Sequence, residues 1–67
     1  MEDIKKKIDI ALQLHKKGKV NDAISLYLKI FSKHEKNSQL LFLLGTAYLQ
    51  INKFDIAIKY LKKSISL

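Results

Sequence analysis

The 67-residue chain contains no cysteine, no proline and no tryptophan, and each of its thirteen basic residues is a lysine. Without cysteine it can form neither a disulfide nor a thiolate metal site. The lack of proline, together with only two glycines, suits helices joined by tight turns. The longest apolar run, Leu40 to Leu44 with its extension to Leu49, is far shorter than the ~20 residues that span a bilayer. Composition therefore points to a small helical protein without a membrane-spanning segment.

The net charge of +7 raises the question of nucleic-acid or anionic-membrane binding. Arginine, the residue suited to bidentate phosphate and guanine contacts, is absent, and the lysines are scattered along the chain. A nucleic-acid-binding module is therefore the weakest of three alternatives. Residues 1–7 show neither an apolar run nor a small-residue cleavage site, so we expect a cytoplasmic protein.

Apolar residues recur at three- and four-residue spacings and predict four helices. We expect them at about residues 3–17, 21–33, 38–51 and from 54 or 55 to the end. Asp3 and Asn21 are the candidate N-caps of the first two helices. Gly18 and Asn52 suit left-handed turn positions between the helices of each pair. Connections this short make neighbouring helices antiparallel.

The chain repeats itself with a period of 34 residues. Five residues recur unchanged at this spacing: Lys19, Ala23, Ile24, Lys29 and Ser32 return as Lys53, Ala57, Ile58, Lys63 and Ser66. A period of 34 with helical patterning is typical of helix–turn–helix repeats, which generally hold other proteins. We expect one domain over residues 1–67, with repeat one at about 4–37 and repeat two at about 38–67.

The second copy resembles the tetratricopeptide repeat, whose pattern is W-x₂-L-G-x₂-Y followed by A-x₃-F. Its matching residues are Leu41, Leu44, Gly45 and Tyr48, then Ala57 and Leu61. The first copy is weaker, with Lys7 in place of the tryptophan. The resemblance implies an all-α fold, a short right-handed solenoid of two helix–turn–helix repeats. It also places Gly45 against the region of Ala57, and Ala11 against that of Ala23, where the helices of a pair come closest.

No arrangement in the sequence predicts catalysis, a cofactor site or a metal site. His15 and His34 lack ligand partners at helical spacing, and the serines lack a histidine–acid pair. We therefore expect no enzymatic activity and no cofactor. The aromatic residues favour a core role over base stacking: Tyr27, Phe31, Phe42, Tyr48, Phe54 and Tyr60.

The resemblance implies a concave groove lined by the first helix of each repeat. The predicted groove residues are Lys5, Ile8, Leu12, His15 and Lys16 in the first repeat, and Gln39, Phe42, Thr46, Leu49 and Gln50 in the second. The alternative for the apolar members is packing between helices. The family's carboxylate clamp uses a lysine and an asparagine where this chain has Ile8 and Leu12, so that mode is disfavoured. The expected partner is a protein or peptide with apolar side chains and acidic flanks.

The second alternative is a docking segment at the N-terminus of a larger enzyme, such as a transferase. Tetratricopeptide arrays generally have three or more repeats and a polar capping helix, whereas this chain has two repeats. Ile58, Leu61 and Ile65 repeat along the last helix with no further helix to cover them. This pattern predicts either a fragment of a longer protein or self-association through these three residues.

Overall fold

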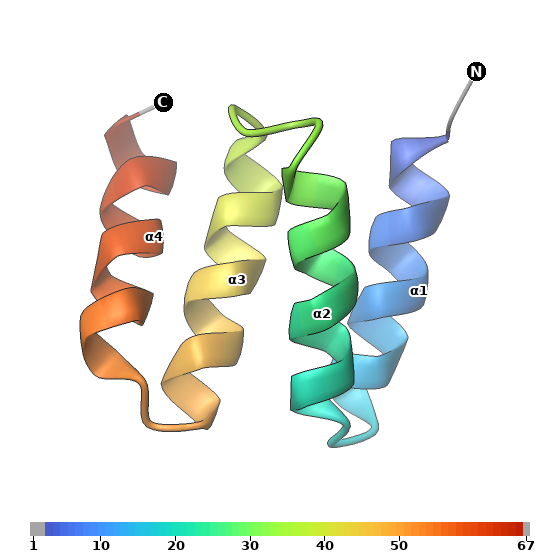
Figure 1. Ribbon diagram of the computed structural model, residues 1–67, viewed down its shortest axis with the longest axis horizontal. Coiled ribbons are helices and arrows are strands. Elements are labelled where there is room, and N and C mark those ends of the chain that lie inside the picture. Colours follow the sequence, from blue (N-terminus) through green and yellow to red (C-terminus); the bar gives the residue numbers. More distant parts are fainter. Residues whose placement is uncertain (1–2, 67) are drawn as a thin grey trace.

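The computed structural model describes residues 3–66, which form four α-helices in a row (Figure 1). They are α1 (Ile4–Lys16), α2 (Val20–Phe31), α3 (Ser38–Gln50) and α4 (Phe54–Ser66). Consecutive helices run antiparallel, and no strand occurs within residues 3–66. The predicted all-α helical repeat is confirmed, with the predicted boundaries correct to within two residues.

Local side-chain chemistry starts α1 and α3. The Asp3 carboxylate accepts a hydrogen bond from the backbone N–H of Lys6 at 3.3 Å, and the Asn37 side chain accepts from that of Leu40 at 2.9 Å. These bonds satisfy amide groups that lack a partner within the helix. The prediction that Asn21 caps α2 is wrong. Helix α2 already begins at Val20, so Asn21 lies inside its first turn and no side chain caps the helix.

The turns inside the two helical pairs are copies of each other. Gly18 has φ 85° and Asn52 has φ 64°, the left-handed conformation predicted for both. After each of them a lysine amide reaches back to the preceding helix: Lys19 N–H donates to the Leu14 carbonyl and Lys53 N–H to the Tyr48 carbonyl, both at 2.9 Å. The 34-residue period of the sequence is therefore also a period of backbone hydrogen bonding.

Small residues let α3 and α4 approach closely, as predicted. A Cβ added at Gly45 would lie 3.3 Å from the Ala57 carbonyl oxygen and 2.6 Å from Leu61 Cγ and Cδ2. Ala57 is fully buried. The side chain of Leu61 thus fills the space above Gly45, where any side chain on residue 45 would have to stand.

The core runs through both pairs, because α2 packs against α3 as well as against α1. Its largest fully buried side chains are Tyr27, Leu40, Leu41 and Leu44. At one end the rings of Phe31 and Tyr60 form a T-shaped pair with their centroids 5.7 Å apart, and the ring of Tyr60 stacks on that of Tyr48.

Two aromatic residues lie outside this core. Phe42 is 52% exposed and Phe54 is 54% exposed, so the prediction of a core position is wrong for both. Within residues 3–66, each ring is thus only partly covered by its surroundings. Within residues 3–66 no helix is long and apolar enough to cross a membrane.

Candidate partner-binding surface

The predicted groove residues of α1 differ in their accessibility. Lys5 and Lys16 are exposed, near the two ends of the helix, and Leu12 and His15 are half-buried. Ile8 is only 3% exposed and belongs to the core. The side chain of Ile8 therefore packs between helices and is not displayed to a partner. For this residue the alternative of packing between helices is correct.

On α3 the predicted residues form a continuous surface. Phe42, Thr46 and Leu49 are spaced by four and three residues and so share one face of the helix. Phe42 and Leu49 are exposed, while Thr46 is half-buried and its Oγ1 donates to the Leu43 carbonyl at 2.9 Å. Gln39 and Gln50 are exposed near the two ends of α3. The hydroxyl of Thr46 is satisfied internally, so this face presents mainly apolar atoms.

A hydrogen-bond network joins the two repeats beside this surface. The His15 Nε2 lies 2.8 Å from Gln50 Oε1, and His15 Nδ1 lies 3.3 Å from the Tyr27 hydroxyl. With Nε2–H donating to Gln50, the lone pair of Nδ1 accepts the Tyr27 hydroxyl proton. The imidazole thereby connects α1, α2 and α3. Sequence reasoning placed His15 and Gln50 in the groove but did not predict this bond, since nothing local relates the two positions.

Burial of Tyr27 has an electrostatic consequence. Its side chain is fully buried, and desolvation raises the pKa of the Tyr27 phenol above its ordinary value. Burial also raises the pKa of Tyr60, and the neighbouring Tyr48 adds to that shift. Both phenols therefore remain neutral hydrogen-bonding groups at physiological pH.

Basic side chains outnumber acidic ones around the surface, where the exposed Asp9 lies between Lys5 and Lys16 on the same side of α1. Lys5 and Lys16 lie at its edge on α1, and none of the ten predicted groove residues is acidic. At moderate ionic strength such charges act over ~8–10 Å, which is enough to attract carboxylates that flank an apolar contact. The surface therefore combines exposed apolar side chains on α3 with lysines at its edge on α1.

The three predicted self-association residues differ in their exposure to solvent. Leu61 is half-buried against Gly45, whereas Ile58 is exposed and Ile65 is 85% exposed. Phe54 is exposed on the same side of α4. We call Phe54, Ile58 and Ile65 the α4 outer face. In α2 the equivalent residues, Val20, Ile24 and Phe31, are buried or half-buried because α3 packs on that helix.

These features define a protein built from helix–turn–helix repeats with a displayed side-chain surface. The family model of the tetratricopeptide repeat matches residues 38–67, so the resemblance is confirmed over the pair α3–α4. Proteins with such repeats typically act as non-catalytic modules that bind other proteins. No curated protein and no solved structure matches the chain significantly.

Proposed function

We propose that this protein is an interaction module that binds a peptide or helix of another protein along the predicted groove residues. One observation carries the proposal: Phe42 and Leu49 are large apolar side chains exposed on one face of α3. Exposing apolar area costs about 25 cal/mol per Å², and polar residues would serve solubility better. A face that keeps such residues is therefore suited to a partner that covers them.

The chemistry of the partner follows from the neighbours of Phe42 and Leu49. Lys5 and Lys16 at the edge favour acidic residues on either side of an apolar contact. The His15–Gln50 contact holds the ends of α1 and α3 together, so a partner meets a surface that is already ordered. We therefore propose a segment with two apolar anchors and acidic flanks.

Selection from a random displayed-peptide library against the immobilised protein tests this function. We expect selected peptides to combine apolar anchors with acidic residues, and Phe42→Ala/Leu49→Ala to weaken their binding at least tenfold, because truncating anchors at the centre of an interface costs about 2 kcal/mol or more. Phe54→Ala is a matched control, since Phe54 is equally exposed but lies on α4.

The readout distinguishes binding from folding. Circular dichroism should show the same helical content in both variants, because Phe42 and Leu49 are exposed. Loss of binding in Phe54→Ala, with binding retained in the groove variant, would place the partner elsewhere and contradict the proposal.

We also propose that the α4 outer face associates with a second copy of the chain at high concentration. A head-to-tail stack of two copies is disfavoured. In such a stack, α4 of one copy would pack against the side of α1 of the next copy that is described below. There α1 carries Lys6, Lys7 and Gln13 at the positions where α3 carries the buried Leu40, Leu41 and Ala47. Moving charged lysine side chains out of water is costly, so the proposed dimer is symmetric, with α4 against α4.

A further inference from the structure

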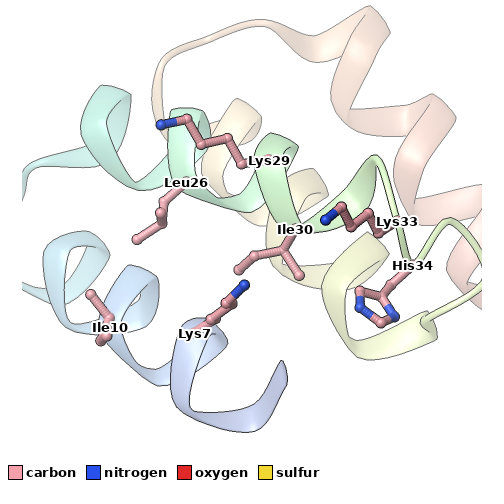
Figure 2. A pocket seen from close by; sticks show the side chains of 7 residues that line it. All are labelled: Lys7, Ile10, Leu26, Lys29, Ile30, Lys33 and His34. Atoms are coloured by element: carbon pink, nitrogen blue, oxygen red, sulfur yellow. The ribbon is translucent and has the colours of Figure 1, made fainter. Parts of the chain in front are cut away.

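A pocket of about 390 Å³ opens between α1 and α2, away from the groove residues (Figure 2). Three apolar side chains point into it, Ile10 from α1 and Leu26 and Ile30 from α2, and basic side chains surround them. Its lining consists of Lys7, Ile10, Leu26, Lys29, Ile30, Lys33 and His34. At 100° per residue, Lys7 and Ile10 lie about 140° and 160° around α1 from the groove residue Leu12. The pocket is therefore a second surface, separate from the proposed groove.

The second repeat shows what the crease between the two helices of a pair can hold. A shift of 34 residues carries Lys7, Ile10 and Leu26 onto Leu41, Leu44 and Tyr60. Leu41 and Leu44 are completely buried, and the ring of Tyr60 makes a T-shaped contact with the ring of Phe31 from α2. The crease between α3 and α4 is thus covered by a neighbouring helix that contributes an aromatic side chain. In the first repeat no helix within residues 3–66 takes that place, and Ile10 is 58% exposed.

Charge distinguishes the two creases. The pocket of the first repeat has three lysines, Lys7, Lys29 and Lys33, and no carboxylate among its lining residues. In the second repeat the buried Leu41 replaces the first of these lysines. An occupant with apolar area for Ile10, Leu26 and Ile30, and with negative charge, would therefore complement this lining. The dipoles of the two helices contribute little, because the N-terminus of α1 and the C-terminus of α2 lie at the same end.

We propose that this pocket binds an acidic peptide segment that inserts one aromatic side chain, in the way that Phe31 packs on Tyr60. The apolar floor takes the ring, and the lysines attract carboxylates on either side of it. This is a binding site additional to the groove and independent of it.

Fluorescence anisotropy with a labelled twelve-residue peptide, one phenylalanine flanked by glutamates, tests the site. Lys29→Glu should weaken binding roughly three- to tenfold, as expected when one exposed charge pair becomes a repulsion. Lys63→Glu is the matched control, because Lys63 is the equivalent residue in the last turn of α4 and changes the net charge equally. We expect less than a twofold effect from it. A peptide with alanine in place of phenylalanine should bind at least tenfold more weakly.

Chemical shifts of the Ile10, Leu26 and Ile30 methyl groups give a second readout that does not depend on a variant. They should move on titration with the peptide, and those of Leu12 and Leu49 should not. Equal weakening by Lys29→Glu and Lys63→Glu would overturn the proposal, as would equal binding of the alanine peptide. Binding sensitive only to Phe42→Ala/Leu49→Ala would assign the peptide to the groove. If a fatty acid bound more tightly and displaced the peptide, the ligand of the pocket would be a lipid and the peptide proposal would be wrong.

Discussion

The imidazole of His15 lies 2.8 Å from the side-chain oxygen of Gln50, although 35 positions separate the two residues in the chain. The contact joins the last turn of α1 to the last residue of α3. Behind the imidazole is the hydroxyl of the buried Tyr27. The two repeats are therefore tied by a polar network on one side, in addition to the apolar packing of α2 against α3.

A double-mutant cycle of His15→Ala and Gln50→Ala should reveal this tie. We expect a coupling free energy of about 0.5–1 kcal/mol, because the bond is exposed to solvent. Urea unfolding of the four proteins measures it. Gln39→Ala is the control, since Gln39 is exposed on the same helix and should show no coupling to His15. Additive effects of His15→Ala and Gln50→Ala would show that the contact contributes nothing.

Replacing Gly45 should destabilise the α3–α4 pair. In Gly45→Ala the new Cβ meets Leu61 at 2.6 Å, and overpacking costs about 1–3 kcal/mol. The better helix propensity of alanine offsets at most about 1 kcal/mol, so thermal melting should show a net loss. In a Leu61→Ala background the clash is removed, and Gly45→Ala should then stabilise the helix. A stabilising effect with Leu61 intact would disprove the close packing.

The buried Tyr27 and the half-buried Tyr60 predict a loss of stability at high pH. Burial raises the pKa of Tyr27 and Tyr60 in the folded state, whereas in the unfolded chain both ionise near pH 10. Above about pH 10 the folded protein therefore binds more protons than the unfolded one. The stabilisation is complete below pH 10 and decreases as the pH rises through the folded-state pKa values.

Comparison with Tyr27→Phe/Tyr60→Phe separates this effect from titration of the lysines. The difference in unfolding free energy between the two proteins should be constant from pH 7 to 9 and change in favour of the variant above pH 10. A difference independent of pH up to 11 would contradict the raised pKa values.

Self-association through the α4 outer face should depend on its isoleucines. A few hundred Å² of apolar area is worth several kcal/mol at about 25 cal/mol per Å², before the entropic cost of association. We expect a melting temperature that rises with protein concentration, and a monomer with a constant melting temperature for Ile58→Gln/Ile65→Gln. Ile10→Gln, on α1, should leave association unchanged. Sedimentation equilibrium showing a monomer at millimolar concentration would exclude the dimer.

The helices, their turns and the close approach of α3 and α4 were all predictable from the sequence. Each depends on a local signal: a capping side chain such as Asp3, or a residue that tolerates positive φ such as Gly18 or Asn52. The place of Gly45 was predictable from the resemblance to the tetratricopeptide repeat, which puts small residues where the helices of a pair come closest. Asn21 was misassigned because several polar residues compete within one turn, and only the backbone geometry decides which one precedes the helix.

The exposure of individual side chains was decided by the tertiary structure. Ile8 and Phe42 are both apolar residues at predicted groove positions, yet one is in the core and the other is exposed. Leu61 and Ile65 share a stripe of α4, and only the approach of α3 turns Leu61 inward. The same holds for the His15–Gln50 contact and the lysine-rimmed pocket. These features depend on the separation and angle between helices that are distant in sequence, and helical periodicity within one helix carries no information about either.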